Sequence, residues 1–370
     1  MRLLLALVLF AVYAAEASPF LFVGSKTNAA VPSPIGLTIY SNSNGHLREV
    51  LHQSNVTTGN QPTYLAVTQD RRFLYMTNEV DVGHVASFKI DDAGTSLTLT
   101  PLGLAPTASH GPVHIAPTKS GWFVLVASYN VGSVTVMQVD ANGLADRIAH
   151  QVVFSGGSHV VPGRQDGPHA HCVALSPNDD FVFVTDLGND RVMQFAFDAT
   201  TGHLTPNAVP FVDVGPGTLP RHMAFHPNGE SLYLTTEASN ELKKYAFDAV
   251  TGTLTLTASV TTTRATGVLT GAIHVTSSGR FVLVSNRYGA PASDDSIVVY
   301  DTETLAHVGT YRTSTWGGPR DFTITDDDFV YVTNENTNSI DTFQLMPDGE
   351  LRHLPLSQPR PFHPQVIVPF

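Results

Sequence analysis

The sequence has a single cysteine, Cys172, among 370 residues. No intrachain disulfide can form, so the fold must be held together by its hydrophobic core. A free cysteine inside an apolar run usually packs as a small hydrophobic side chain, so we assign Cys172 no catalytic role. Charged residues make up only 14% of the chain, and the net charge is -12. This balance excludes a nucleic-acid partner, which needs clustered lysine and arginine, and favours a small or neutral one.

Motifs for cofactors and nucleophiles are missing too. The sequence contains no GxGxxG after a strand, no Walker pattern and no serine nucleophile elbow, so it does not support a nucleotide cofactor or a serine hydrolase. Its 16 histidines make a metal the competing hypothesis. Only His169-Ala170-His171 has a suitable spacing, and nearby arginines would repel a cation. We therefore expect no cofactor and no catalytic metal.

Only the N-terminus carries a longer apolar run. Met1-Arg2 precedes Leu3 to Tyr13, and Ala15-Glu16-Ala17 follows. A basic start, a short apolar core and small residues at the exit are typical of a secretory signal peptide, and this run is too short to span a bilayer. We expect cleavage after residue 17 and a secreted, extracellular chain of residues 18–370 without a membrane anchor. The sequon at Asn55 predicts N-glycosylation there.

Hydrophobic residues make up 42% of the sequence, and the apolar runs are rich in Phe, Tyr, Val and Thr, which favours strands. Two such runs around a turn form a frame that recurs about every fifty residues. Copies of the frame occupy Pro62–Asn78, Pro112–Asn130, Pro168–Asn189, Pro220–Glu237, Gly271–Arg287 and Pro319–Asn334, with Tyr64, His114, His171, His222, Ala272 and Asp321 as equivalent positions. Two more strands follow each frame, and four strands per repeat predict the blade of a propeller.

The two ends of the chain complete each other. Residues Phe20 to Ser25 match the second strand of the frame but lack a first strand, while Pro364 to Val368 match the missing piece. We therefore predict an all-β, seven-bladed β-propeller with four antiparallel strands per blade, whose first blade is closed by the C-terminal strand. The Gly-rich insertion Ser155–Asp166 is expected to form a loop over one mouth of the channel.

Small-molecule sites of propellers lie where the innermost strands begin, at one mouth of the channel. This rule brings together one set of charged and polar side chains: His114, His169, His171, Arg221, Glu237, Arg287 and Arg320, with Asp186 and Glu335 at its edge. The alternative interpretation is a polar channel whose groups pair with one another and with water. His222 is assigned a structural role, because the alternation of a strand turns it away from Arg221.

These residues resemble those of the propeller-type lactonase family, which includes bacterial 6-phosphogluconolactonases and fungal carboxy-cis,cis-muconate cyclases. The resemblance covers nearly all of residues 18–370. It rests on His114-Ile115 with Phe123–Asn130, on His169-Ala170-His171 with Asp186–Arg191, on Pro220–Pro227 and on Gly318-Pro319-Arg320. It implies a catalytic set of His171, Arg221, Glu237 and Arg287. We add His114, His169 and Arg320 as expected substrate-binding residues.

The expected function is metal-free hydrolysis or formation of a lactone by acid/base catalysis with arginine stabilisation. The partner would be a small lactone or organic acid, and the chain would act as a monomer. A signal peptide does not fit a cytosolic phosphosugar substrate. Muconate cyclase activity and a non-catalytic extracellular binding or adhesion propeller remain alternatives. We expect Glu237→Gln or Arg221→Ala to abolish turnover and to leave the melting curve little changed.

Overall fold

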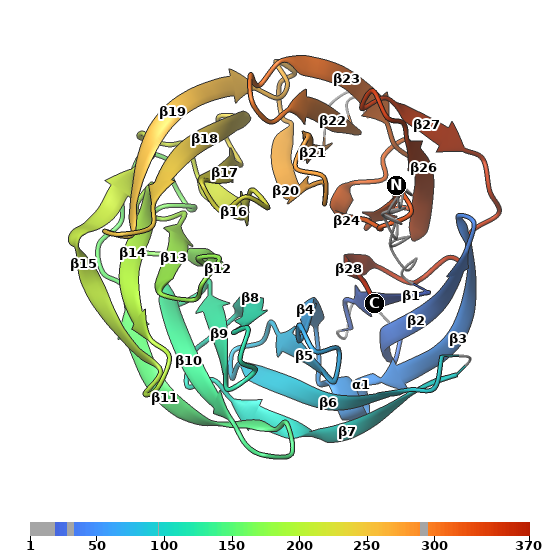
Figure 1. Ribbon diagram of the computed structural model, residues 1–370, viewed down its shortest axis with the longest axis horizontal. Helices are drawn as coiled ribbons and strands as arrows, with labels where there is room; N and C mark the ends of the chain where they lie inside the picture. Colours follow the sequence, from blue (N-terminus) through green and yellow to red (C-terminus); the bar gives the residue numbers. More distant parts are fainter. Residues whose placement is uncertain (1–18, 28–32, 95, 289–294) are drawn as a thin grey trace, which may run out of the picture.

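The chain folds into a ring of seven four-stranded antiparallel sheets around a central axis (Figure 1). The structure is a computed structural model that describes residues 19–27, 33–94, 96–288 and 295–370. The predicted seven-bladed propeller is confirmed. The proposed signal peptide, residues 1–17, lies outside the described residues and stays a prediction. Among the described helices, none has the length and apolar character needed to cross a membrane.

The blades follow one another along the chain, and each runs from an innermost to an outermost strand. Blade 1 contains β28 (Pro364–Pro369), β1 (Phe20–Ser25), β2 (Ile35–Ser43) and β3 (His46–Ser54), and the short helix α1 (Asn55–Thr58) follows it. Blade 2 contains β4 (Pro62–Val67), β5 (Phe73–Asn78), β6 (His84–Asp92) and β7 (Leu97–Pro106). Blade 3 contains β8 (Pro112–Pro117), β9 (Phe123–Ser128), β10 (Ser133–Val139) and β11 (Ala145–Val153).

The second half of the ring repeats this order. Blade 4 contains β12 (Ala170–Leu175), β13 (Phe181–Asp186), β14 (Arg191–Asp198) and β15 (His203–Asp213). Blade 5 contains β16 (Pro220–Phe225), β17 (Ser231–Thr236), β18 (Glu241–Asp248) and β19 (Thr253–Thr261). Blade 6 contains β20 (Leu269–Val275), β21 (Phe281–Arg287), β22 (Ser296–Asp301) and β23 (His307–Arg312), and blade 7 contains β24 (Pro319–Ile324), β25 (Phe329–Asn334), β26 (Ser339–Leu345) and β27 (Leu351–Leu354).

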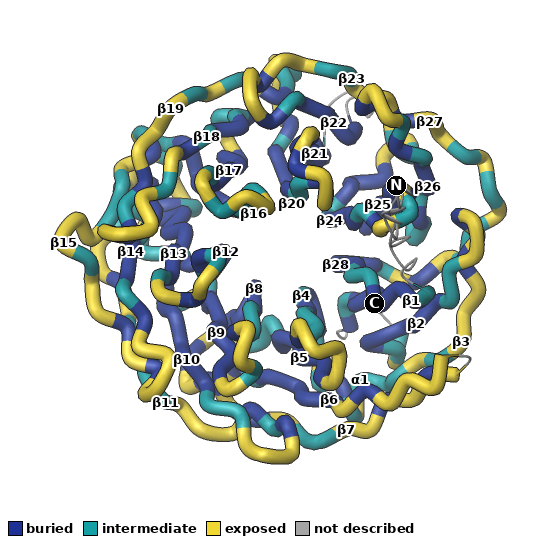
Figure 2. Tube along the Cα trace, in the orientation of Figure 1, coloured by how far each residue is buried: buried dark blue, intermediate teal, exposed yellow. Residues whose placement is uncertain are grey.

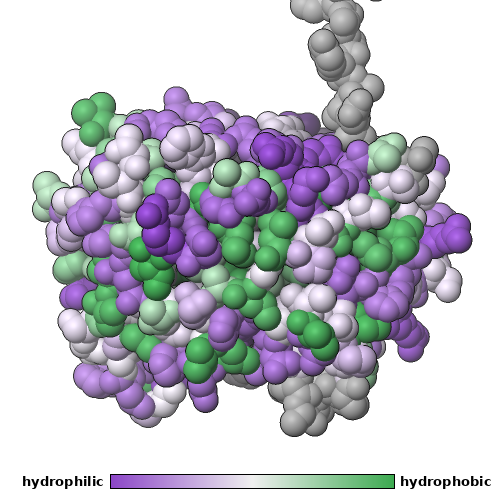
Figure 3. Space-filling view, turned by 90° about the horizontal axis from the view of Figure 1, so that it is seen from below, coloured by the Kyte–Doolittle hydropathy of each residue, from purple (hydrophilic) through white to green (hydrophobic). Residues whose placement is uncertain are grey.

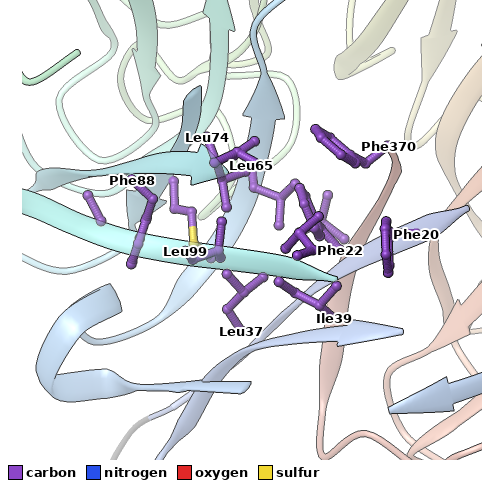
Figure 4. Packing of buried hydrophobic residues seen from close by; sticks show 14 residues of the cluster. Phe20, Phe22, Leu37, Ile39, Leu65, Leu74, Phe88, Leu99 and Phe370 are labelled. Carbon is purple, nitrogen blue, oxygen red and sulfur yellow. The ribbon is translucent and has the colours of Figure 1, made fainter. Parts of the chain in front are cut away.

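The two ends of the chain close the ring as predicted. β28 pairs with β1 in antiparallel register, with Val23 opposite Ile367. The core lies between neighbouring blades, where apolar side chains of two sheets interlock. Figure 4 shows this packing at the junction of blades 1 and 2, where the rings of Phe22 and Phe370 stack at 5.2 Å. The innermost strands are mostly buried, and the outermost strands mix exposed and intermediate residues with a few buried ones (Figure 2).

The outer wall of the ring is mixed in character. Figure 3 views the ring edge-on and shows hydrophilic side chains interspersed with small apolar patches. Such alternation is expected for outer strands that face solvent on one side. The part of the wall visible in this view therefore carries no extended apolar surface.

Every innermost strand carries a β-bulge near its beginning. In β12, Ala170 pairs with Asp186 and Cys172 pairs with Thr185, so His171 has no partner of its own. In the other six blades, the corresponding residue is the one directly after the last paired residue that precedes the bulge. These residues are Thr63, Val113, Arg221, Gly271, Arg320 and Gln365. A bulge interrupts the alternation of a strand and re-aims its side chains. These seven positions therefore form one layer at the beginning of the innermost strands.

We expect Ile367→Ala to lower the free energy of unfolding by about 2–5 kcal/mol, because it leaves a cavity where blades 7 and 1 meet. Ile367 is buried with Tyr331 and Ile340 at this junction. Val209→Ala, on the exposed outer strand β15, should change the value by less than about 0.5 kcal/mol. Urea denaturation of both variants measures the difference. Equal, small effects would contradict the role of β28 in closing the ring.

Candidate active site

Side chains of the bulge layer meet around a small cavity in the channel. The cavity is lined by Thr63, Tyr64, Glu79, Val113, His171, Arg221, His222, Arg320, Asp321 and Gln365. Six of the seven bulge positions are among them. The seventh bulge position is Gly271 in blade 6, which has no side chain: a Cβ there would lie 3.4 Å from Nε of Arg287 and 2.5 Å from Oγ of Ser285. Gly271 thus leaves room for Arg287 from the adjacent strand β21.

The bulge corrects two assignments made from the sequence. By strand pairing, Cys172 and not His171 is equivalent to Tyr64 and His114, since Cys172 is opposite Thr185. His171 instead shares the bulge position of Arg221. His222 does not turn away from Arg221, because both lie within the bulge and both line the cavity. Simple alternation could not place either residue correctly, since one extra residue shifts the pattern by one.

The carboxylate of Glu237 is surrounded by three guanidinium groups. Its Oε2 lies 3.2 Å from Nη2 of Arg287, which donates a hydrogen bond, and 3.3 Å from Nε of Arg221, an ion contact without hydrogen-bond geometry. Its Oε1 accepts a hydrogen bond of 2.7 Å from Nη2 of Arg164. The Arg221 and Arg287 side chains are each 3% exposed, and Glu237 is 4% exposed. Unlike charges are therefore held together out of water.

The charges of this cluster fix its protonation state. Burial alone would raise the pKa of Glu237, but Arg287, Arg221 and Arg164 together outweigh it and lower this pKa to about 2. Burial, with the neighbouring guanidinium groups of Arg287 and Arg320, lowers the pKa of Arg221 to about 9. At neutral pH the carboxylate is therefore ionised and Arg221 still carries its positive charge.

Arg164 was not predicted from the sequence. It lies in the insertion between β11 and β12, which was expected to cover a mouth of the channel, and it reaches Glu237 from there. The frame of fifty residues could not place it, because the insertion has no counterpart in the other repeats. The only available signal was a rare arginine inside a loop predicted to lie over the site.

A second group of charges lies beside the first. The hydroxyl of Tyr288 donates to Oε2 of Glu335 at 2.6 Å and accepts from Nη1 of Arg287 at 3.1 Å. Burial alone would lower the pKa of Arg320, but Glu335 above all, with Tyr288 and Glu79, raises it. Tyr288 thus connects the Glu237 cluster to the Arg320–Glu335 pair. The predicted residues Arg287 and Arg320 are brought together at one side of the channel.

His171, in blade 4, lies near the guanidinium groups contributed by blades 5, 6 and 7. The centroid of its ring lies 5.1 Å from that of the His222 ring and 5.8 Å from that of the Tyr129 ring, and both contacts are edge-to-face. Burial lowers the pKa of His171 well below its usual value, and Arg221, Arg320 and Arg287 lower it further. Its Nδ1 is buried and has no hydrogen-bond partner in the described structure; the same holds for Nη1 of Arg221 and Nε of Arg287. The site therefore combines a neutral imidazole with unsatisfied guanidinium N–H groups.

His169 lies at the edge of this site in a fixed orientation. Its ring stacks on Tyr129 at 4.3 Å, and its Nδ1 lies 2.9 Å from the carbonyl oxygen of Tyr129. Since a carbonyl only accepts, Nδ1 donates, and Nε2 is the acceptor in the neutral ring. Asp186 accepts the backbone N–H of His169 at 2.9 Å and a side-chain bond of 2.6 Å from Asn189. Asp186 therefore holds the backbone of His169 and the side chain of Asn189, and it forms no ion pair with the arginines of the described site.

His114 lies one layer deeper than the bulge residues. Its ring stacks on Tyr64 at 4.1 Å, its Nε2 lies 3.4 Å from Sγ of Cys172, and its Nδ1 lies 3.5 Å from the backbone nitrogen of Val173. Burial lowers the pKa of His114 to about 3, helped by Arg221 and His274, and burial raises the pKa of Cys172 to about 12. Both ring nitrogens of His114 thus have protein contacts, and its expected role in substrate binding stays a prediction.

Metal ligation has no support in the described part of the chain. No group of three or more His, Cys, Asp or Glu side chains is arranged there to hold a metal ion. The expected glycosylation site lies elsewhere: Asn55 begins α1, and its Nδ2 donates to Oδ1 of Asn60 at 3.1 Å. Glycosylation of Asn55 stays a prediction.

Comparison with known proteins agrees with this geometry. Residues 20–362 match the family described as lactonase, 7-bladed beta-propeller. The chain belongs to this family. Among its lactonase relatives, the 6-phosphogluconolactonase of Formosa agariphila is 28% identical over 348 residues, which cover 90% of this chain and 95% of that protein. The 6-phosphogluconolactonase of Bacillus subtilis is 30% identical over 313 residues, with 81% and 85% covered.

A solved structure shows the same relationship. The periplasmic gluconolactonase of Pseudomonas aeruginosa superposes on the present lactonase with a TM-score of 0.81 at 26% identity, covering 94% of this chain and 98% of that one. The protein is therefore an enzyme of the lactonase class, as the residues at the channel suggested.

The buried position of Glu237 revises the expectation that its replacement leaves melting unchanged. Glu237→Gln removes the negative charge from three arginines, so it should destabilise the lactonase by about 3–5 kcal/mol at neutral pH. The folded pKa of Glu237 is lowered from 4.5 to about 2. Its ionisation therefore stabilises the fold fully above pH 4.5, and this contribution is lost as the pH falls toward 2.

Urea denaturation from pH 7 to pH 2 measures this contribution as the difference in stability between the wild type and Glu237→Gln. We expect a difference that is constant above pH 4.5 and shrinks below it, in step with the lowered pKa. A difference that does not depend on pH would show that Glu237 is not held ionised by its neighbours.

Proposed function

We propose that the protein is a secreted, metal-free enzyme that hydrolyses an unphosphorylated sugar lactone. The observation that carries the proposal is the pair of arginines, Arg221 and Arg287, held by Glu237 with unsatisfied N–H groups beside the neutral His171. The similarity to a periplasmic gluconolactonase supports a substrate found outside the cytosol. The predicted signal peptide supports the same location.

The arginines supply the electrostatic part of the mechanism. Attack of water on the lactone carbonyl places negative charge on the carbonyl oxygen. Nη1 of Arg221 and Nε of Arg287 are buried donors without protein partners, so they can bind this oxygen as the charge develops. Because the guanidinium groups are already held in place, little reorganisation is needed during the reaction.

His171 supplies the proton transfer. In the free enzyme its pKa is lowered by burial and by Arg221, Arg320 and Arg287, so its ring is neutral and Nδ1 can accept a proton from the attacking water. Negative charge on the carbonyl oxygen offsets the arginines and raises the proton affinity of His171 as the bond forms. The same proton then passes to the ring oxygen that leaves as an alcohol.

Glu237 acts as a positioning group in this scheme. A carboxylate with a pKa of about 2 is a weak base. Both of its oxygens are in contact with guanidinium groups, so it orients Arg221 and Arg287 and balances their charge. Since all of these residues come from one ring of blades, the proposed enzyme acts as a monomer.

We expect His171→Asn to lower kcat by about 10²–10⁴, because asparagine places a polar atom near Nδ1 but cannot take up a proton. A pH-stat assay with glucono-δ-lactone, its 6-phosphate and a muconolactone measures the effect and the substrate preference. His226→Asn is the matched control, since His226 bonds the backbone of Gly279 outside the cavity. The control should keep the wild-type rate.

Full activity of His171→Asn would contradict its role as the base. Preference for the phosphorylated lactone or the muconolactone would refute the proposed substrate. If the wild type hydrolysed none of the three lactones and bound glycans or cell surfaces, the protein would be a binding propeller.

Chelation tests the metal-free mechanism. The arginines beside His171 disfavour a bound cation. After extended dialysis against EDTA, we expect kcat for the preferred lactone to stay within about twofold of the untreated enzyme, since no step of the proposed scheme uses a metal. Loss of activity that returns on adding a divalent metal would overturn this part of the proposal.

A further inference from the structure

Arg164 differs from the other arginines of the Glu237 cluster in its exposure. Its side chain is 35% exposed, whereas those of Arg221 and Arg287 are 3% exposed. Nη2 of Arg164 donates to Glu237 at 2.7 Å and Nε lies 3.5 Å from the hydroxyl of Tyr129. Nη1 makes no hydrogen bond within the described part of the protein and is available to a ligand on the solvent side of the cluster.

The loop that carries Arg164 is firmly attached to blade 4. Gln165 is completely buried; its Oε1 accepts the backbone N–H of Val161, and its Nε2 donates to the carbonyl of Leu187, both at 3.0 Å. The backbone N–H of Ser158 donates to the carbonyl of Gly188 at 2.8 Å. Arg164 is therefore held over Glu237 by a fixed loop, which lowers the entropic cost of binding a ligand there.

Two aromatic residues continue the wall beside Arg164. Tyr129 is half-buried and stacks with His169 at an interplanar angle of 13°. Because Nδ1 of His169 is bound to the carbonyl of Tyr129, Nε2 can accept a hydrogen bond from a hydroxyl group in the neutral ring. This wall thus offers guanidinium donors and an imidazole acceptor, the two partners that an alcohol uses.

The size of the inner cavity places a substrate against this wall. The cavity has a volume of about 10 Å³, which is room for about one water molecule. A carbonyl group can reach into it, but a lactone ring cannot. Arg221 lines this cavity and also contacts Glu237. A ring whose carbonyl meets Arg221 is therefore placed beside Glu237, where Arg164 is exposed.

We propose that Arg164, His169 and Tyr129 form a subsite that binds the hydroxyl groups carried by the lactone ring. This proposal rests on the proposed function. It adds which part of the substrate the enzyme recognises, the hydroxyl groups of the ring. Arg164 donates to ring hydroxyls, His169 accepts from one of them, and Tyr129 supports the His169 ring. The subsite makes the enzyme selective for polyhydroxylated lactones over lactones that bear no hydroxyl group.

Product binding tests the subsite independently of turnover. Isothermal titration compares gluconate with 5-hydroxypentanoate, which keeps the carboxylate and the C5 hydroxyl but lacks the sixth carbon and the other hydroxyl groups. We expect Arg164→Gln to weaken gluconate binding about tenfold to a hundredfold, the range for hydrogen bonds to a charged group, and 5-hydroxypentanoate binding by less than about threefold. Arg264→Gln, at an exposed position before β20, is the control and should change neither.

Kinetics with two lactones separate the two roles of Arg164, which are recognition of substrate hydroxyl groups and support of Glu237. For Arg164→Gln, we expect kcat/KM to fall about tenfold to a hundredfold for glucono-δ-lactone and less than about threefold for δ-valerolactone. Arg164→Lys restores the charge beside Glu237 but not the planar set of donors, so it should recover only part of the loss.

Equal losses for both ligands would show that Arg164 acts only through Glu237 and would overturn the subsite, as would unchanged gluconate binding. A wild type that binds neither acid also overturns it. A wild type that binds gluconate through Arg164 but hydrolyses no lactone would leave the subsite standing and refute the proposed hydrolase.

Discussion

One extra residue near the beginning of each innermost strand decides which side chains reach the channel. Without the bulge, only every second side chain of a strand points toward the channel, and the side chains between them point to the other face of the sheet. With it, adjacent residues such as Arg221 and His222 line the same cavity. The seven bulges occur at equivalent places around a closed ring, so residues far apart in the sequence converge on one axis. The fold supplies the positions, and the identity of each bulge residue supplies the chemistry.

Glu237 makes this convergence of positive charge tolerable. Three guanidinium groups would repel one another strongly in a buried site if no counter-charge were present. The carboxylate contacts all three and stays ionised because they lower its pKa to about 2. Burial lowers the pKa of His171, and two of these arginines, Arg221 and Arg287, lower it further together with Arg320. The ion cluster therefore fixes the donors used in catalysis and helps to keep the imidazole neutral.

Much of the architecture could be predicted from the sequence, because it depends on patterns that repeat. The recurring frame and the match between the two chain ends predicted seven blades and their closure by β28. The site was predicted as a group of residues but not in its register, since a bulge of one residue leaves no mark on the hydrophobic pattern. His171 was therefore aligned with His114, although it shares the position of Arg221.

Arg164 and Tyr288 show a different limit. Neither lies at a position that the repeat defines: Arg164 belongs to an insertion found in one blade, and Tyr288 follows the last residue of β21. Their contacts with Glu237 and Glu335 depend on how individual loops cross the mouth. Periodicity carries no information about such crossings, so these residues could be found only in three dimensions.

The most direct test is a crystal structure of the protein with gluconate bound. The account predicts that the carboxylate contacts Arg221 and Arg287 at about 3 Å beside His171, with the chain of hydroxyls directed toward Arg164. Gluconate bound elsewhere, for example in the groove between blades 5 and 6 lined by His226, Lys244 and Arg280, would contradict it. So would a carboxylate that avoids both arginines while occupying the channel.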